Sequence, residues 1–399
     1  MKTSLRFCAS TALALVMSVT CFAQHYTQTN LVSNKAGVAP VTDPKLINAW
    51  GLSRGSGSPW WVSDRATGVS TLYDGAGAKQ SLIVTIPPAD PAKTKIGSPT
   101  GTIFNGSQTD FLLAPGQAAA FLFSTIDGTI AGWNPNVAVG QGGKPPSTHA
   151  VTVVKTTDGS SYTGLTSAFI DGKRYLYAAN FTKGRVDVYD NAFHVVMLSK
   201  EHFSQDSSVQ NGNPSEEPFA DEQLPPHYVP FNVQAIGNDV VVAFALHEDG
   251  SRFETDGPGL GYVDIFSSSG RLLQRLEHGD WLNAPWGVAL APLDFGRFSH
   301  DLLVGQFAGG GDTQSSGFVA AYDLATGKFD GLLQDAGGKP LAIKGIWDLS
   351  PGNVSPTNSD AAAAPAAEMY FTAGPNRGSG GLFGFLTAVS TELTEGNAQ

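Results

Sequence analysis

The chain has 399 residues, of which 47 are glycine, 24 are proline and only 15% are charged, and its formal net charge is −11. An excess of negative charge opposes binding to nucleic acid or to an anionic membrane surface, so we expect neither as a partner. The glycine and proline content suits many tight turns between short strands, and alternating β-rich runs outnumber helical patterns. We therefore expect an all-β protein.

The first 23 residues have the pattern of a secretory signal peptide. Lys2 and Arg6 precede an uncharged, largely apolar run that ends in small residues, and we expect cleavage after Ala23. A lipoprotein anchor at Cys21 is the weaker alternative because the residues before it match that signal poorly. The apolar run is shorter than the ~20 residues of a membrane span. We expect an exported protein, periplasmic or extracellular, with no membrane span.

Both cysteines of the chain, Cys8 and Cys21, lie inside this leader. The exported protein would then have no disulfide and no thiolate chemistry, so a hydrophobic core must hold it together. Loss of the leader would leave 22 of the 24 basic side chains against 35 acidic ones. We expect a monomer.

After the leader, the chain is built from a repeated unit of four short strands. In the first unit, residues 48–74 contain three apolar or alternating runs separated by turn residues, and a fourth run follows at 81–86. Four antiparallel strands make one blade of a β-propeller. The units are expected at residues 50–86, 101–154, 165–198, 231–276, 283–333 and 345–386.

The sixth unit lacks its fourth strand. An open sheet edge would expose unpaired backbone groups, and the segment Tyr26 to Val32 alternates in the manner of a strand. We predict a six-bladed β-propeller with four-stranded antiparallel blades, in which this N-terminal segment closes the ring. The propeller would span residues 24–390, followed by a short tail at 391–399.

Three longer segments interrupt the repeat, at residues 204–230, 247–260 and 351–367. The first two are acidic, and the third ends in a run of alanines. Long connections of this kind are either functional or disordered, and the sequence leaves both readings open.

Several short motifs, taken in combination, carry a resemblance to known proteins. Each begins at the numbered residue: Asn48-Ala-Trp-Gly-Leu, Trp61-Val-Ser-Asp, Gly68-Val-Ser-Thr-Leu-Tyr-Asp, Asp127-Gly-Thr-Ile-Ala-Gly-Trp-Asn-Pro, Pro230-Phe-Asn-Val-Gln, Leu282-Asn-Ala-Pro-Trp-Gly and Phe371-Thr-Ala-Gly-Pro. With these motifs the chain resembles a family of uncharacterised exported bacterial propellers, which is similar in architecture to NHL-repeat and gluconolactonase-like propellers. The resemblance implies a propeller fold and an exported location, and it implies no particular reaction. Many members of that family end in a PEP-CTERM sorting tail. Residues 394–399 show neither that motif nor a hydrophobic tail, so we do not expect surface retention by that route.

The loops on one face of the propeller provide the candidate site. Loops that lead into the innermost strands, and loops between second and third strands, gather there around the channel. The residues predicted to contact a ligand are Asn48, Trp50, Arg65, Asn180, Trp286, Gln306, Asn376 and Arg377. The alternative is that the repeated Asn and Trp residues cap and pack the blades, with the Asn side chains bonded to their own turns.

Converging carboxylate and amide oxygens at a channel mouth suit a hard cation such as Ca2+, which takes about 6 to 8 oxygen ligands. The candidate ligands are Asn232, Asn283, Asp64 and Glu248. The resemblance to gluconolactonase-like propellers implies a cation that polarises a lactone carbonyl, although the ligating glutamate of that group has no counterpart on a matching strand here. Asp64, His247 and Glu248 are the candidate catalytic residues, as general acids or bases. For His247 and Glu248 the alternative is a solvated loop.

The sequence therefore predicts a secreted propeller that binds a small molecule, a glycan or a protein partner at its channel face. The enzyme alternative is a calcium-dependent hydrolase or lactonase that acts at the channel mouth.

Overall fold

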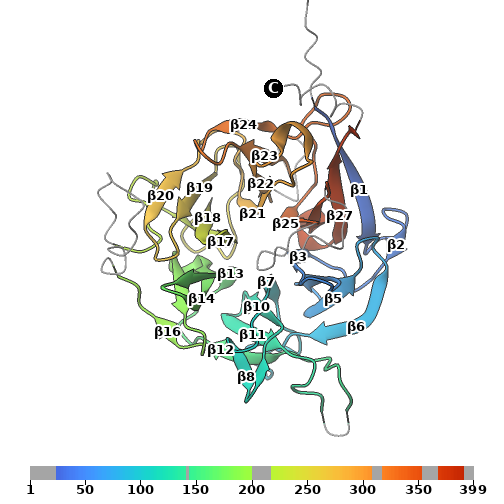
Figure 1. The fold of residues 1–399 in the computed structure, drawn as a ribbon, viewed down its shortest axis with the longest axis vertical. Coiled ribbons are helices and arrows are strands. Elements are labelled where there is room, and N and C mark those ends of the chain that lie inside the picture. Colours follow the sequence, from blue (N-terminus) through green and yellow to red (C-terminus); the bar gives the residue numbers. More distant parts are fainter. Residues whose placement is uncertain (1–23, 141–142, 200–216, 308–316, 353–366, 391–399) are drawn as a thin grey trace, which may run out of the picture.

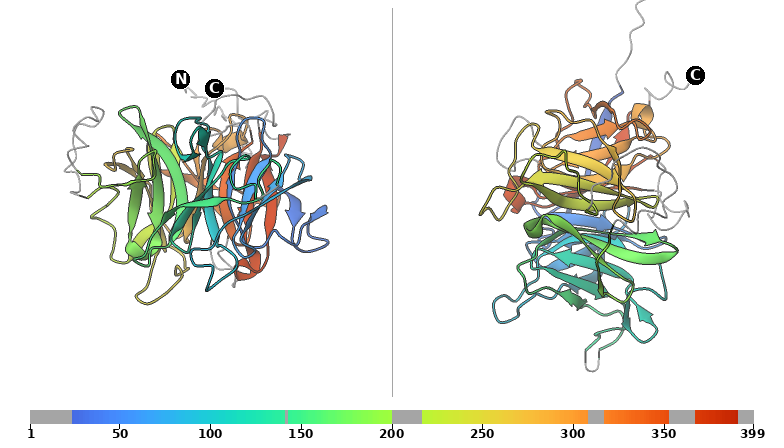
Figure 2. Two further views of the ribbon diagram at one scale, coloured as in Figure 1. Left: turned by 90° about the horizontal axis from the view of Figure 1, so that it is seen from below. Right: turned by 90° about the vertical axis from the view of Figure 1, so that its left-hand side faces the viewer.

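The computed structural model describes residues 24–140, 143–199, 217–307, 317–352 and 367–390, and these residues form a six-bladed β-propeller (Figure 1). The blades follow one another around the ring in chain order, and seen from its edge the ring is a disc with connecting loops on both faces (Figure 2). The prediction of an all-β, six-bladed propeller is confirmed.

Each of the first five blades is an antiparallel sheet of four strands that follow chain order from the channel to the rim. Blades 1 and 2 contain β3 (Ala49–Ser53), β4 (Trp60–Asp64), β5 (Val69–Tyr73), β6 (Lys79–Thr85), and β7 (Pro99–Phe104), β10 (Phe121–Thr125), β11 (Thr129–Trp133), β12 (Val151–Lys155). Blades 3 and 4 contain β13 (Tyr162–Ile170), β14 (Lys173–Asn180), β15 (Arg185–Tyr189), β16 (Val195–Val196), and β17 (Tyr228–Ile236), β18 (Asp239–Leu246), β19 (Gly261–Phe266), β20 (Leu272–Arg275). Blade 5 contains β21 (Pro285–Leu290), β22 (Leu302–Gln306), β23 (Val319–Tyr322) and β24 (Phe329–Leu332). A small hairpin, β8 (Leu112–Ala114) with β9 (Gln117–Ala118), lies between β7 and β10 and was not predicted.

The sixth blade joins the two ends of the described chain. It contains β25 (Ile346–Pro351), β26 (Met369–Ala373) and β27 (Leu382–Ala388), and β1 (Tyr26–Ser33) pairs antiparallel with β27 as its outer strand. The short strand β2 (Val41–Thr42) adds to the outside of β1. The predicted closure of the ring by the N-terminal segment is confirmed.

Hydrophobic clusters fill the interfaces between neighbouring blades. Among the described residues, one cluster lies at each of the six blade interfaces. At the interface of blades 1 and 2, for example, Trp61 stacks on Phe121 with ring centroids 4.1 Å apart. Each blade face is therefore buried against the next blade. Because the strands lie in these interfaces and the turns lie outside them, apolar strands alternate with polar turns along the sequence.

The innermost strands approach one another too closely for most side chains at one repeated position. A Cβ atom on Gly51 of β3 would lie 2.5 Å from the carbonyl oxygen of Thr100 on β7, and Gly287 of β21 lies similarly against Trp347. In blades 4 and 6 a polar side chain occupies this position and forms the contact. Asn232 Nδ2 donates to the Trp286 carbonyl (2.7 Å), and Asp348 Oδ2 accepts from the Leu52 N–H (2.7 Å).

All six innermost strands also contain a β-bulge near their start. In every blade the pairing of the first strand with the second shifts register there, as between Ala49 and Leu52 in β3. A bulge turns side chains to a different face of the sheet. The side chains of the first residues in these strands therefore do not alternate regularly between the two faces of the sheet, so simple alternation does not predict which of them point toward the channel mouth.

No helix among the described residues is long and apolar enough to cross a membrane.

Candidate functional site

A cavity of about 570 Å³ lies at the end of the channel where the innermost strands begin. We call it the mouth pocket. Its lining comprises six aromatic residues, five charged residues, four small or polar residues and one isoleucine: Trp50, Phe181, Phe231, Phe253, Phe307 and Trp347, then Arg65, Arg252, Glu254, Asp256 and Arg377, then Asn48, Ser161, Thr163 and Gly378, and Ile126.

Stacked aromatic rings form the floor of the mouth pocket. Trp347 lies between Trp50 and Phe307, with ring centroids 3.6 and 3.9 Å away, and Trp286 meets Trp50 and Trp347 edge-on. These rings belong to a hydrophobic cluster separate from the six between the blades. They close the channel at this end and give the pocket an apolar base.

Hydrogen bonds fix two of these rings in place. Trp347 Nε1 donates to Asn48 Oδ1 (2.8 Å), and Trp286 Nε1 donates to the Thr163 carbonyl (3.0 Å). Asn48 has a φ of 52°, a left-handed conformation that asparagine tolerates better than most residues. By contrast, the Trp50 indole N–H is buried and has no hydrogen-bond partner within the described ranges.

The segment 247–260, between β18 and β19, forms one wall of the pocket. Three contacts hold it: the Thr255 N–H donates to the Leu246 carbonyl (2.8 Å), the Gly257 N–H donates to Asn283 Oδ1 (2.8 Å), and His247 Nε2 lies 2.9 Å from the Ser251 carbonyl oxygen. This acidic segment, which the sequence left as either functional or disordered, is thereby ordered over the pocket. It contributes Arg252, Phe253, Glu254 and Asp256 to the lining.

Burial shifts the pKa of several charged groups in or beside the pocket. Glu254 is partly exposed toward the pocket, and burial, its largest influence, raises the pKa of this carboxyl to about 7, with Asp256 adding to the rise and Arg65 opposing it. Burial lowers the pKa of the Arg65 guanidinium, while Glu254 and Asp127 oppose that effect. Burial likewise raises the pKa of Asp127.

A strained turn places Arg377 at the pocket. It belongs to the short segment α1 (Pro375–Gly378), in which both Asn376 and Arg377 have φ of 55°. Asn48 lies directly against Gly378, where a Cβ would be 2.6 Å from Asn48 Nδ2. Non-glycine residues in the left-handed region are costly and often occur at binding sites.

Four of the residues predicted to contact a ligand line the mouth pocket: Asn48, Trp50, Arg65 and Arg377. Asn376 is exposed beside Arg377. Trp286 packs behind the floor, and Gln306 Oε1 accepts from the Asn283 N–H (2.9 Å), so both support the pocket from behind.

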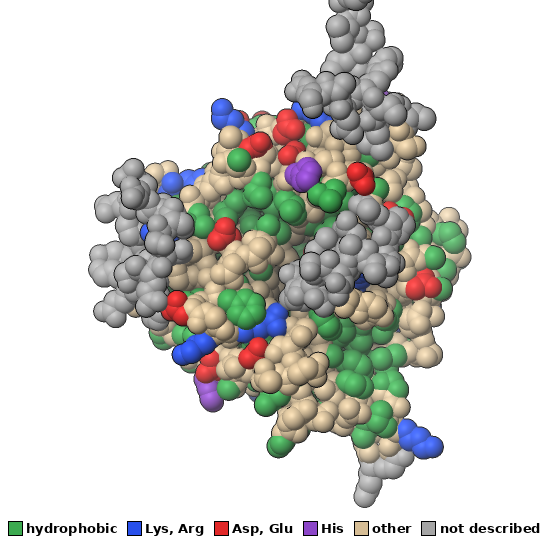
Figure 3. Space-filling view, viewed as in Figure 1, with side chains coloured by type: hydrophobic (Ala, Val, Ile, Leu, Met, Phe, Trp, Pro, Cys, Tyr) green, Lys and Arg blue, Asp and Glu red, His purple; other side chains and the backbone are tan. Residues whose placement is uncertain are grey.

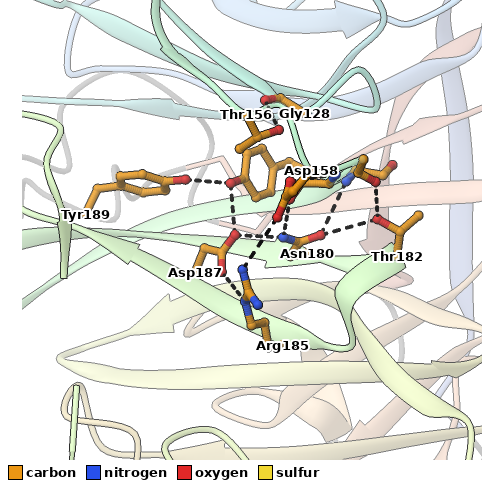
Figure 4. Close-up of polar contacts among 12 residues, drawn as sticks. Gly128, Thr156, Asp158, Asn180, Thr182, Arg185, Asp187 and Tyr189 are labelled. Carbon is orange, nitrogen blue, oxygen red and sulfur yellow. Dashed lines mark hydrogen bonds and ion pairs between the residues drawn. The ribbon is translucent and has the colours of Figure 1, made fainter. Parts of the chain in front are cut away.

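Asn180 instead lies within blade 3, in the polar network of Figure 4. Its Nδ2 donates to Asp187 Oδ2 (2.7 Å) and to Ser160 Oγ (2.9 Å), while the Tyr162 hydroxyl donates to the same Asp187 oxygen (2.9 Å). Arg185 Nε donates to Asp187 Oδ1 (2.6 Å). This network joins the first three strands of the blade.

Asp64 takes the matching place in blade 1, since both residues end the second strand of their blade. Asp64 Oδ2 accepts from the Thr71 N–H (3.1 Å) and from the Thr71 hydroxyl (2.7 Å), and burial raises the pKa of Asp64 well above its usual range. Its catalytic role stays a prediction.

The four candidate calcium ligands lie on separate elements, and none lines the mouth pocket. Asn232 and Asn283 are engaged by Trp286 and Gly257, Asp64 by Thr71, and Glu248 is an exposed loop residue. Within the described ranges, no group of three or more His, Cys, Asp or Glu side chains is placed to hold a metal ion. Calcium binding stays a prediction.

Several pocket residues were not predicted. Phe231 and Trp347 directly precede Asn232 and Asp348, just as Trp50 precedes Gly51 in blade 1, so the repeat itself contained a signal for them. Arg252 and Glu254 belong to no repeated motif, and only the contacts of their loop bring them to the pocket.

The opposite end of the channel holds a second cavity of about 460 Å³, lined by the other ends of innermost strands. It is more polar, and its lining includes Arg174 and Asp348. Burial raises the pKa of Asp348 to about 7, although the Leu52 and Leu349 N–H groups that it accepts from oppose the rise. Among the described residues on the face of the ring shown in Figure 3, acidic and basic side chains are scattered and form no large patch of one sign.

The fold and the pocket define the class of protein: a six-bladed β-propeller with an aromatic-floored pocket at the mouth of its channel. No family model matches the chain. Uncharacterised proteins of Acanthamoeba polyphaga mimivirus are similar in sequence. One is 28% identical over 363 residues, covering 89% of this chain and 84% of the relative, and a second is 27% identical over 362 residues, covering 89% and 78%. A third is 26% identical over 262 residues, and the match spans under half of that relative, 43% of its length.

Among solved structures, a protein of unknown function from Bacteroides thetaiotaomicron is similar with a TM-score of 0.50 and 9% identity, over 91% of this chain and 76% of that one. This likeness concerns the fold alone. Lower scores relate the chain to an aldose sugar dehydrogenase from Streptomyces coelicolor (TM-score 0.48, 12% identity, 92% and 99% covered) and to virginiamycin B lyase from Staphylococcus aureus (0.43, 9%, 92% and 100%).

Proposed function

We propose that this protein is an exported propeller that binds a small organic molecule with a flat apolar ring in the mouth pocket. The observation that carries the proposal is the concave, aromatic-floored cavity itself. Ligand sites are typically apolar clefts of about 300 to 1,000 Å³ with a few polar groups that orient the ligand, and the mouth pocket of about 570 Å³ has this size and composition.

The shape of the site favours a small molecule over the protein partner considered from the sequence. A stable protein interface buries roughly 1,200 to 2,000 Å² of surface, whereas the aromatic residues here lie inside a recess at the channel mouth. A glycan would use the same rings by stacking, so a ring-shaped sugar derivative belongs to the proposed ligand class. Export after loss of residues 1–23, and a monomeric state, belong to the proposal and rest on the sequence.

One observation favours the enzyme alternative. Glu254 faces the pocket with a pKa raised to about 7, which suits a general acid or base near neutral pH. The sequence placed this role at Glu248 in the same loop, and Glu254 is the better placed of the two because it lines the pocket.

The proposal can be tested with a neutral bicyclic probe, 2-naphthamide, by ligand-observed NMR titration. Phe253 lines the pocket but is 59% exposed, so Phe253→Ala is expected to fold normally. Loss of its ring should weaken binding about fivefold, which corresponds to roughly 1 kcal/mol of apolar contact.

Leu293→Ala is the matched control, because Leu293 is 64% exposed and lies outside the pocket. It should leave binding unchanged. Equal weakening by both variants, or no binding of the probe by the wild-type protein, would contradict the proposal.

A further inference from the structure

The mouth pocket contains an arginine whose guanidinium has too few partners. Arg65 follows β4, and its N–H donates to the Asn48 carbonyl (3.2 Å), which fixes the backbone beside the pocket floor. Its guanidinium lies over the Trp50 ring, 5.7 Å from the centroid. The Nε atom is buried and has no hydrogen-bond partner among the described residues, and none of their carboxylates lies within ion-pair distance of this side chain.

From this geometry we infer that the mouth pocket selects organic anions, and that Arg65 receives the carboxylate of the ligand while the ring of the ligand lies against the aromatic floor. The inference rests on the proposed function and specifies its ligand class. A planar guanidinium binds a carboxylate through two parallel N–H donors, and such charge-assisted bonds are stronger than neutral ones.

The other charges of the pocket favour the same sign of ligand. Arg252 and Arg377 also line it, so three cationic side chains face two acidic ones there, in a chain whose overall charge is −11. Glu254 is partly protonated near neutral pH, which further reduces the negative charge in the pocket. A half-buried cation gains from an anion that reaches it, because partial burial removes water without supplying a partner.

An aromatic floor can also bind a cation through the faces of its rings, so the opposite ligand class must be considered. A cationic ligand would have to pair with Glu254, Asp256 or both, and it would lie among three arginines. Moreover, the outer face of the Trp50 ring is already covered by Arg65. Arg65 therefore disfavours a cation at the face of the Trp50 ring.

Arg65 is the arginine that should dominate. Arg252 and Arg377 are exposed, whereas Arg65 is half-buried beside Trp50 and the Asn48 turn, close enough to Glu254 for each to influence the pKa of the other. Water screens exposed charges and reduces their contribution. Because Arg65 is less screened, its removal should cost more affinity than removal of either exposed arginine.

The test compares three probes that share one ring: 2-naphthoate, 2-naphthamide and 2-naphthylmethylammonium. We expect the wild-type protein to bind the naphthoate at least tenfold more tightly than the naphthamide, and the ammonium most weakly. Arg65→Gln should weaken naphthoate binding about tenfold or more, while naphthamide binding changes less than threefold. A melting curve for Arg65→Gln, expected to match the wild type or exceed it, shows that the variant is folded.

Lys328→Gln is the charge-matched control. Lys328 is exposed in the turn between β23 and β24, at the end of blade 5 away from Gln306 and the pocket, and its loss changes the net charge equally. Equal affinity for naphthoate and naphthamide, tighter binding of the ammonium, or equal effects of Arg65→Gln and Lys328→Gln would overturn the inference and leave the ring-binding pocket intact. Failure of all three probes to bind would overturn the inference together with the proposed function.

Discussion

Replacing Tyr26 by alanine is expected to destabilise the whole propeller, because this residue fastens the strand that closes the ring. Tyr26 is 2% exposed, and its ring packs on Phe295 and Phe298 of blade 5, with centroids 4.9 and 5.8 Å away. Its hydroxyl donates to the Phe295 carbonyl (2.9 Å). One side chain on β1 therefore ties blade 6 to blade 5.

The size of the effect follows from these contacts. Truncation of a buried aromatic residue to alanine costs about 3 to 5 kcal/mol, since apolar contact is lost and a cavity remains. Tyr26→Phe keeps the ring and loses only the hydroxyl contact, so it should cost about 1 to 2 kcal/mol. With an unfolding entropy of about 2 cal/mol/K per residue, the alanine variant should melt roughly 5 °C below the wild type.

The assay is urea unfolding followed by tryptophan fluorescence, together with a thermal melt. Thr27 is the matched control: it neighbours Tyr26 on the same strand and is exposed, so Thr27→Ala should change the unfolding free energy by about 0.5 kcal/mol or less. Deletion of residues 25–33 should be more damaging than any point change because it exposes the unpaired edge of β27. If Tyr26→Ala unfolds at the same urea concentration as Thr27→Ala, β1 does not close the ring in solution.

Two further predictions concern buried polar groups. Asp348 is 6% exposed with a pKa raised to about 7, so the folded state holds its proton over a range in which the unfolded chain has released it. The stabilisation of the folded state by protonated Asp348 is therefore fully present below about pH 4. It is lost as pH rises through 7, which lowers the free energy of unfolding by at most about 4 kcal/mol. Urea unfolding at pH 5 and pH 8 should show the lower stability at pH 8, and Asp348→Asn should reduce the difference; a pH-independent midpoint for the wild type would contradict this. Asn232→Ala removes the bond to the Trp286 carbonyl and should cost about 1 to 3 kcal/mol equally in calcium and in EDTA. A calcium-dependent rise in the wild-type melting temperature that Asn232→Ala lacks would instead support the calcium alternative.

The fold could be predicted because every blade repeats the same physical requirements. Short β-rich runs separated by turn residues predict strands, and an outer strand missing from the last unit leaves an edge that some other segment must cover. Tyr26 to Val32 was the alternating segment ahead of the first unit, and β1 occupies that place. Such reasoning needs only local pattern and strand count, so it does not depend on the details of any loop.

The wall of the mouth pocket depends on contacts that no local pattern contains. Glu254 and Arg252 face the pocket because Gly257 is bonded to Asn283, which is 26 residues away in the chain, and because His247 holds the Ser251 carbonyl. The sequence predicts His247 and Glu248 of this segment as candidate catalytic residues. The structure shows that His247 shapes the loop, and that a glutamate six positions later reaches the pocket.

Bulges explain why the repeated polar residues could not be assigned to the channel from sequence. A shift of one residue in register moves a side chain to the other face of a strand, and the innermost strand of blade 1 is bulged between Ala49 and Leu52. Trp50 consequently lies on the pocket floor, while Asp64, paired opposite Ala49 at the end of β4, is buried inside the blade with Thr71. Asn180 and Gln306 end their second strands in the same way and are likewise fully buried.

Arg65, one residue beyond Asp64, has left the strand and is free of this constraint, so its side chain reaches the pocket. The buried polar residue that ends the second strand in blades 1, 3 and 5 thus maintains the blade, and in blade 1 the next residue is a group that can bind a ligand.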